Sequence, residues 1–188
     1  MNIYQIKSPV NSYNVVDLDV VKLAMALGDA DLIRPLMTAS YDNLSLNDLW
    51  TKTLECHYFG EARQQDYDIS VFGTYLIFKM NAYHVVHDDL SQFGEFLPLN
   101  VEGVNMMLYN CLTFGQEQEE LCETDYLEGL DNGLKTLVFD ESDVDSKLIF
   151  KSKRQGAMKL YCSDKVKDII ELNKFKGVLF DTDLLTLF

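Results

Sequence analysis

His84 and His87 are the residues whose types and spacing come nearest to metal chemistry in this chain. Residues three apart lie on adjacent turns of one helix face, so two imidazoles placed there could share a metal ion. Asp88 and Asp89 follow directly. A metalloprotease helix, however, carries its histidines four residues apart with a glutamate between them, and that arrangement is absent. The spacing therefore favours a solvated polar helix face over a metal centre.

The adjacent pair Cys56 and His57 combines the residue types of a thiol–imidazole catalyst. Neighbouring side chains diverge, however, and such a catalyst needs its two groups to approach from different segments. The sequence also lacks a glycine-rich phosphate loop, a GxSxG turn and the protein-kinase motifs. We therefore expect no catalytic residue, no metal and no cofactor, and a protein that is not an enzyme. One alternative stays open, a small cytoplasmic enzyme whose polar residues come together only on folding.

Acidic residues concentrate in two segments, 117–131 and 140–145. The second lacks the central glycine and closing glutamate of a calcium loop. Carboxylates accept paired hydrogen bonds from arginine, and Tyr126 and Leu127 add apolar anchors between the acids. The segments are therefore either solvated loops or a docking face for a basic protein. The candidate docking residues are Glu117, Glu119, Glu120, Glu123, Asp125, Tyr126, Glu128, Asp140, Glu141, Asp143 and Asp145.

The whole chain is acidic, with 30 Asp and Glu residues against 16 Lys and Arg and a formal charge of −14. Nucleic acid is disfavoured as a partner, because phosphate contacts require clustered basic residues. An anionic membrane is disfavoured for the same reason. A basic protein partner is favoured, since opposite charges accelerate encounter. The alternative is that the acidity serves solubility alone.

The sequence favours the cytoplasm. The N-terminus has no basic region followed by an apolar run, so we expect no secretory signal. No window approaches eighteen consecutive apolar residues, which predicts no membrane span. Without an export signal, four scattered cysteines with no CxxC pair predict free, mostly buried thiols rather than disulfides.

Hydrophobic periodicity and turn residues predict the elements that position these side chains. We expect strands at 3–6, 75–78, 95–99, 104–113, 134–139, 147–151, 158–161 and 178–180. We expect helices at 17–27, capped by Asp17 and ended by Gly28, at 30–37, at 81–90, capped by Asn81, and at 164–172, capped by Ser163. A turn of helix around Trp50 is expected at 47–54, a loop at 56–68, and a loop or exposed helix at 116–131.

Strands outnumber helices and short turns join most neighbours, which predicts an α+β fold with a mixed, largely antiparallel sheet packed by helices. Two strand–helix–strand segments, 76–99 and 159–180, resemble each other, with Tyr83 and Val86 matching Val166 and Ile169. The similarity reflects either a duplication or chance. We expect an irregular, partly helical N-terminal lobe at 1–68 and an α+β domain at 69–188, together forming one compact unit.

Residues 69–182 resemble one family of bacterial immunity proteins from polymorphic-toxin and contact-dependent inhibition systems. The resemblance rests on residues 93–99 (FGEFLPL), on residues 160–170 (LYCSDKVKDII) and on residues 175–180 (FKGVLF). It implies neutralisation of a cognate toxin by tight, non-covalent binding in the cytoplasm of the producing cell. It implies no catalytic residue.

An acidic immunity protein would suit a toxin that binds nucleic acid, because carboxylates can occupy a phosphate-binding groove. The expected partner is therefore a cognate toxin domain, and the acidity favours a basic, nuclease-like one. A further alternative is an acidic nucleic-acid mimic that blocks a host or phage enzyme without a dedicated toxin.

Overall fold

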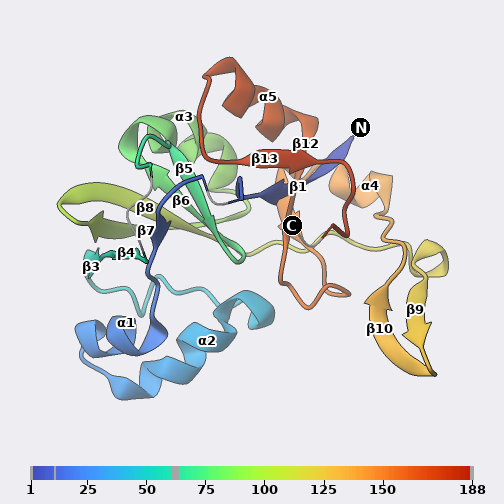
Figure 1. Cartoon of the computed structure of the whole chain (residues 1–188), viewed down its shortest axis with the longest axis horizontal. Helices are drawn as coiled ribbons and strands as arrows, with labels where there is room; N and C mark the ends of the chain where they lie inside the picture. Colours follow the sequence, from blue (N-terminus) through green and yellow to red (C-terminus); the bar gives the residue numbers. More distant parts are fainter. Residues whose placement is uncertain (1, 11, 61–63, 187–188) are drawn as a thin grey trace.

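The chain forms two main β-sheets packed by helices, shown in Figure 1 for the computed structural model. The structure describes residues 2–10, 12–60 and 64–186. One sheet has five strands in the order β3-β7-β8-β6-β5, and the other has four in the order β11-β12-β1-β13. Within the described strands β3 and β7 pair in parallel, and the other neighbours are antiparallel. The expected α+β class with a mixed, largely antiparallel sheet is confirmed.

The five-stranded sheet contains β3 (Leu54–Cys56), β5 (Ile69–Phe72), β6 (Tyr75–Lys79), β7 (Gly94–Val101) and β8 (Val104–Cys111). The four-stranded sheet contains β1 (Ile3–Lys7), β11 (Ile149–Lys151), β12 (Leu160–Ser163) and β13 (Leu179–Asp181). Two further pairs are β2 (Val15–Val16) with β4 (Tyr58–Phe59), and β9 (Thr124–Leu127) with β10 (Leu130–Leu134). The α-helices are α1 (Val20–Leu27), α2 (Ile33–Asp42), α3 (Met80–Leu90), α4 (Glu141–Val144) and α5 (Asp164–Leu172). Short 3₁₀ helices lie at η1 (Ala30–Leu32) and η2 (Glu119–Leu121).

Two units of the same topology make up most of the fold. In the first, β5 and β6 form a hairpin, α3 and β7 follow, and β8 lies between β6 and β7, antiparallel to both. In the second, β11 and β12 form an antiparallel pair, α5 and β13 follow, and β1 lies between β12 and β13. The expected pair of similar strand–helix–strand units is therefore present. The two units differ in where the inserted strand lies in the sequence. In the first unit the inserted strand, β8, follows the other strands, whereas in the second unit the inserted strand, β1, precedes them.

Strand pairing joins segments on both sides of residue 68, the boundary expected from the sequence. β1 lies inside the C-terminal four-stranded sheet, and β3 extends the five-stranded sheet beside β7. The N-terminal segment therefore contributes strands to both sheets, in addition to α1 and α2.

The N-terminal helices differ from expectation at their ends. Helix α1 begins at Val20 because Asp19, not Asp17, accepts hydrogen bonds from the amides of Val21 and Lys22. Gly28 ends it as expected, with φ of 87°. Pro35 lies in the first turn of α2, where no helical amide bond is lost, so the helix continues to Asp42 rather than ending at residue 37.

Three expected caps and turns are corrected by the structure. Lys79, rather than Asn81, precedes α3, and the Asn81 amide instead donates to Asp68 at 2.6 Å. Ser163 stands at the start of α5 as expected, but its hydroxyl forms no capping bond. The segment around Trp50 is a turn rather than helix, and the indole N–H donates to the Pro98 carbonyl at 3.0 Å.

The acidic central segment contains more regular structure than expected. Residues 116–123 form a loop with the exposed 3₁₀ helix η2, as expected for the segment 116–131, whereas the β9–β10 hairpin occupies residues from Thr124 onward in place of the expected loop or helix. Residues 135–139 form no strand of their own, because Leu137 and Phe139 pack into a core and Phe139 contributes only an isolated bridge to Glu117. Helix α4 follows Asp140, whose carboxylate accepts from the Ser142 amide, and lies between the positions of the strands expected at 134–139 and 147–151.

Three hydrophobic cores hold these layers together. Alternation along β6 directs Ile77 into a first core under α1 and α2, and Leu76 and Phe78 into a second core with α3 and α5. The third core contains Phe150 and Tyr161, from the four-stranded sheet, packed against residues 122–144. The two sheets are thus covered by helices and by the acidic central segment, from which β9 and β10 extend outward (Figure 1).

Candidate protein-docking hairpin

The β9–β10 hairpin projects from the body of the molecule (Figure 1). Its two-residue turn, Glu128 and Gly129, has φ values of 51° and 82°. Positive φ at both central positions is the signature of a type I′ turn, whose twist matches that of a two-stranded ribbon. Gly129 adopts its positive φ without strain, whereas Glu128 adopts one in place of the usual Asn, Asp or Gly, and the result is a tight reversal at the tip.

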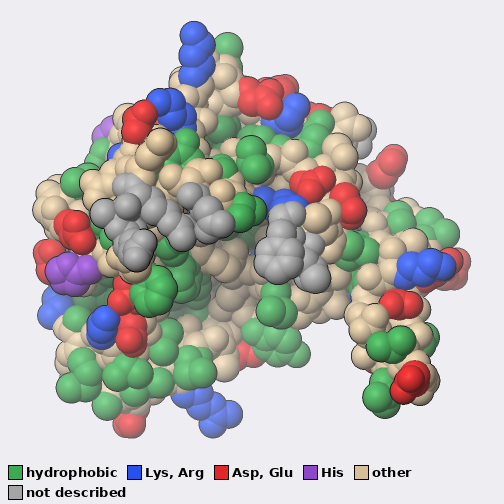
Figure 2. All heavy atoms as spheres, viewed as in Figure 1, with side chains coloured by type: hydrophobic (Ala, Val, Ile, Leu, Met, Phe, Trp, Pro, Cys, Tyr) green, Lys and Arg blue, Asp and Glu red, His purple; other side chains and the backbone are tan. Residues whose placement is uncertain are grey.

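Three large apolar or aromatic side chains lie exposed near that tip. Tyr126 and Leu127 each expose 65% of their surface, and Leu130 exposes 75%. Leu127 pairs across the strands with Leu130, whereas Tyr126 pairs with Asp131, so the two pairs occupy opposite faces of the ribbon. Figure 2 shows hydrophobic and acidic side chains side by side on this projection. The tip therefore offers apolar contacts on both faces, next to negative charge.

The hairpin is held at its base and is otherwise unsupported. Within the described residues β9 and β10 pair only with each other, and such a ribbon is marginally stable in water. At the base the Lys135 amide donates to the Glu123 carbonyl at 2.8 Å. The Glu123 amide donates to the Thr136 hydroxyl, and that hydroxyl donates to the Leu121 carbonyl, both at 2.8 Å. The base is thus anchored, while the tip stands free of the sheets.

The acids of the hairpin fall into two groups. Glu123 forms an ion pair with Lys135 at 3.2 Å, and Asp125 accepts from the Asn132 amide at 2.7 Å. Glu128 lies exposed in the turn. Both ion-pair partners are well exposed, so water and salt screen the pair and a competing arginine can displace it.

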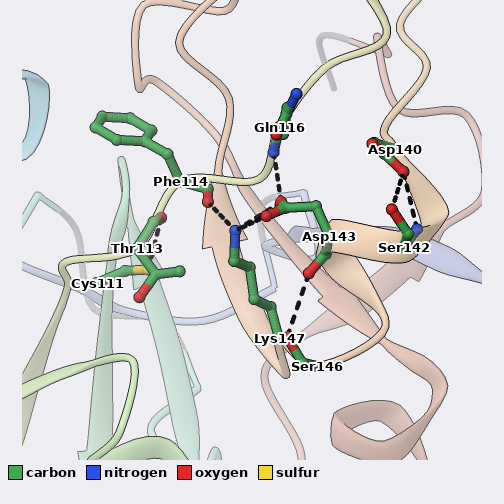
Figure 3. Close-up of polar contacts among 9 residues, drawn as sticks. All are labelled: Cys111, Thr113, Phe114, Gln116, Asp140, Ser142, Asp143, Ser146 and Lys147. Atoms are coloured by element: carbon green, nitrogen blue, oxygen red, sulfur yellow. Dashed lines mark hydrogen bonds and ion pairs between the residues drawn. The ribbon is translucent and has the colours of Figure 1, made fainter.

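In the second acidic segment, Asp143 is committed to the fold, as Figure 3 shows. The Lys147 ammonium donates to both carboxylate oxygens at 2.6 Å, and the Gln116 amide donates at 2.7 Å. Lys147 also donates to the Phe114 carbonyl at 2.8 Å. Partial burial raises the pKa of Asp143, but the Lys147 and Gln116 hydrogen bonds outweigh it and hold the pKa below the usual value. This carboxylate therefore fastens residues 114–116 to the end of α4.

Two more candidate carboxylates have internal roles. Asp140 accepts from the hydroxyl and amide of Ser142, and these bonds lower the pKa of Asp140 (Figure 3). Glu117 accepts from the Ser152 hydroxyl at 2.7 Å and from the Arg154 amide at 3.2 Å. Both side chains stabilise the fold, which leaves fewer carboxylates for a partner.

The other candidates are exposed. Glu119 and Glu120 lie on η2, and a groove of about 500 Å³ runs along residues 116–121 beside Asp140. Glu141 and Asp145 flank α4 at exposed positions. The structure therefore separates the eleven candidates into internal carboxylates and three exposed groups, on the hairpin, on η2 and at α4. The hairpin exposes three large apolar or aromatic side chains beside its acids, whereas η2 exposes one, Leu121.

Leu130 and Asp131 belong to this site but were not among the sequence candidates. The signal was present, since Glu128-Gly129 separates two runs, TDYL and LDNGL, as a two-residue hairpin loop does. The high acid content obscured it, because strands are usually poor in Asp, Glu and Gly.

The thiols and histidines form no second site in the part of the chain that the structure describes. Burial raises the pKa of Cys56 and of Cys111 to about 11, so these thiols stay protonated at neutral pH. All four cysteines are buried and unpaired. His87 packs against Tyr83 and Phe96, and no group of three His, Cys, Asp or Glu residues in the described ranges could hold a metal ion.

Comparison with models of known protein families gives no match, and no curated protein matches the chain. Among the described residues, the helices are too short or too polar to cross a bilayer.

Proposed function

We propose that this protein is an immunity protein, which neutralises a cognate bacterial toxin in the cytoplasm by direct, non-covalent binding through the β9–β10 hairpin. The observation that carries the proposal is the hairpin tip, where Tyr126, Leu127 and Leu130 are exposed on an otherwise unsupported ribbon. A soluble chain gains nothing for its own fold by exposing three such side chains together, whereas a bound partner would bury them. The resemblance over residues 69–182 supplies the class of partner.

The partner's contact surface is basic in this proposal. The exposed acids of the hairpin and η2, Asp125, Glu128, Asp131, Glu119 and Glu120, lie on a chain of net charge −14. Such a field accelerates encounter with a positive surface and can align arginine side chains with carboxylates. The apolar tip then supplies the contacts that slow dissociation.

A rescue experiment tests the function. The chain is co-expressed with the C-terminal domain of the protein encoded immediately upstream of its gene, as the candidate toxin, and survival is scored together with co-purification of the two proteins. We expect survival and a stable complex. Death of the cells with no complex would contradict the proposal, and inhibition of unrelated nucleases without a dedicated partner would instead favour an acidic nucleic-acid mimic.

The electrostatic part has its own test. Association rates measured from low to high salt should fall steeply, because ions screen the long-range attraction. If a complex forms but its association rate does not depend on salt, the electrostatic part of the proposal is wrong, while binding through the apolar tip is still supported.

A further inference from the structure

An open apolar cavity of about 570 Å³ is lined by residues of α1, of α2 and of the five-stranded sheet. Its apolar and aromatic lining comprises Leu18, Val20, Leu23, Leu36, Met37, Leu46, Trp50, Phe72, Tyr75 and Leu108. Most of these belong to the first core and are buried, so the floor of the cavity lies at core depth rather than on a flat surface. Cavities of this size and lining are typical of sites for small molecules, whereas protein interfaces are flatter.

The open cavity leaves the apolar side chains of its lining in contact with water. An apolar group bound there would remove that surface from water, which is favourable. Met37 and Phe72 border the cavity and are 68% and 36% exposed, so two bulky side chains stand at its rim where a ligand could be covered. Figure 2 shows hydrophobic side chains gathered over α1 and α2, with acidic ones next to them.

The polar groups that line the cavity carry net negative charge. Asp17 and Asp19 both line it. Asp17 forms an ion pair with Lys22 at 2.8 Å, and among the residues that the structure describes Asp19 forms none. Asp19 uses one oxygen to cap α1. The Lys22 side chain is 70% exposed, so an incoming ammonium group can displace it from Asp17.

Tyr75 supplies a third polar group. It is half-buried in the lining, and no hydrogen bond joins its hydroxyl to any other residue that the structure describes. A phenol both donates and accepts, so it can bind a polar head group as the carboxylates do.

We propose that this cavity binds a small amphipathic cation, with an apolar body against the core and an amine head group at Asp17, Asp19 and Tyr75. The two carboxylates disfavour anionic amphiphiles such as fatty acids. The proposal is independent of toxin binding, because the cavity and the hairpin share no residue.

Trp50 allows a direct measurement. It is the only tryptophan in the chain and it lines the cavity, so its fluorescence reports occupancy. The probes are decylammonium and decanoate, which share an alkyl chain and differ in the charge of the head group, titrated below their micelle concentrations. We expect decylammonium to bind saturably and at least about fivefold more tightly than decanoate binds. The reason is the one net negative charge at the opening of the cavity, which attracts an ammonium group and repels a carboxylate. Octylammonium should bind roughly tenfold more weakly than decylammonium, since two methylenes are lost.

Two matched variants locate the site. Met37→Arg places a positive charge at the rim and should weaken decylammonium binding by about tenfold or more, while Leu172→Arg, at an exposed position on α5, should leave it unchanged. Both positions are exposed, so neither variant should prevent folding. The absence of saturable binding would overturn the proposal. The cavity would then be better explained as a pocket for a side chain of a protein partner. Equal binding of decanoate, or equal weakening by the two variants, would also overturn it.

Discussion

Leu127 and Leu130 are cross-strand partners at the tip of the β9–β10 hairpin, directly before and after its turn, and both are largely exposed. A hairpin supported by the protein core would turn such a pair inward, as in β7–β8, where the cross-strand partners Leu97 and Leu108 are both buried. Here no sheet of the described chain lies against the pair. The pair therefore fits a surface that another molecule covers.

The exposed leucines should be dispensable for folding. We expect Leu127→Ser and Leu130→Ser to change the free energy of unfolding by no more than about 0.5 kcal/mol each. Leu97→Ala, a truncation in the first core, should cost about 2–5 kcal/mol. Urea denaturation monitored by Trp50 fluorescence measures all three. A loss from the serine variants comparable to that from Leu97→Ala would mean that the tip serves the fold.

Glu95 should be structural, although it lies in the FGEFLPL segment that carries the family resemblance. Its buried carboxylate accepts from the Ser45 hydroxyl and the Leu46 amide at 2.6 Å, and from the Asn110 amide at 2.8 Å. Glu95→Ala leaves three donors without an acceptor, so we expect a loss of about 3 kcal/mol or more. Glu55→Ala, at an exposed position on β3, is the control for denaturant unfolding. Equal midpoints for the two variants would contradict this role.

Gly177 should tolerate no side chain. A Cβ built there lies 1.9 Å from the Ile69 carbonyl oxygen, and φ is 111°. Because the obstacle is backbone, Gly177→Ala must displace the start of β5, and we expect a loss above about 2 kcal/mol. Gly103→Ala also has positive φ, of 88°, but meets nothing within 4 Å, so it should lose only about 1 kcal/mol. Thermal denaturation of the pair separates the steric effect from the conformational one.

The buried Lys151 should make stability depend on pH in the alkaline range. Its ammonium donates to the Ser40 carbonyl at the C-terminal end of α2, and burial lowers the pKa of Lys151 from 10.5 to about 8. Between those values the unfolded chain holds a proton that the folded chain has released. The contribution of this group to the free energy of unfolding therefore rises from pH 8 to 10.5, by at most roughly 3 kcal/mol.

Lys151→Met removes this contribution. The unfolding free energy of the native chain minus that of the variant should therefore increase from pH 8 to pH 10.5, measured by urea denaturation at each pH. The control is Lys153→Met, two residues along at an exposed position. A difference between native chain and Lys151→Met that stays flat across this range would contradict a buried, readily deprotonated lysine.

The sequence predicted the elements whose apolar period is regular. Helices α3 and α5 and the strands around them lie within a few residues of their expected positions, because Val86, Leu90 and Val166 mark one buried face. The two similar strand–helix–strand units were also visible in the sequence, although the strand inserted into each was not. The pairing of β1 with β12 links residues about 160 apart, and no local pattern encodes so distant a partner.

The site was predicted only in part. The acidic segments were found, but carboxylates such as Asp143 and Asp140 differ from Glu128 only in what surrounds them after folding. The charge of a side chain can be read from the sequence, but its hydrogen-bond partners are known only once the chain has folded. Leu130 was missed because its meaning depends on the turn at Gly129, which reverses the chain and brings Leu127 opposite.

The most direct test is the affinity of the hairpin variant Tyr126→Ala/Leu127→Ala/Leu130→Ala for the toxin domain from which the chain protects cells in the rescue experiment, measured by calorimetry. A matched variant, Val104→Ala/Leu172→Ala/Leu179→Ala, removes exposed apolar side chains elsewhere. We expect the hairpin variant to bind about thirtyfold or more weakly with its fold intact, and the matched variant to bind as tightly as the native chain. Native affinity in the hairpin variant, or an equal loss in both, would contradict docking through the hairpin.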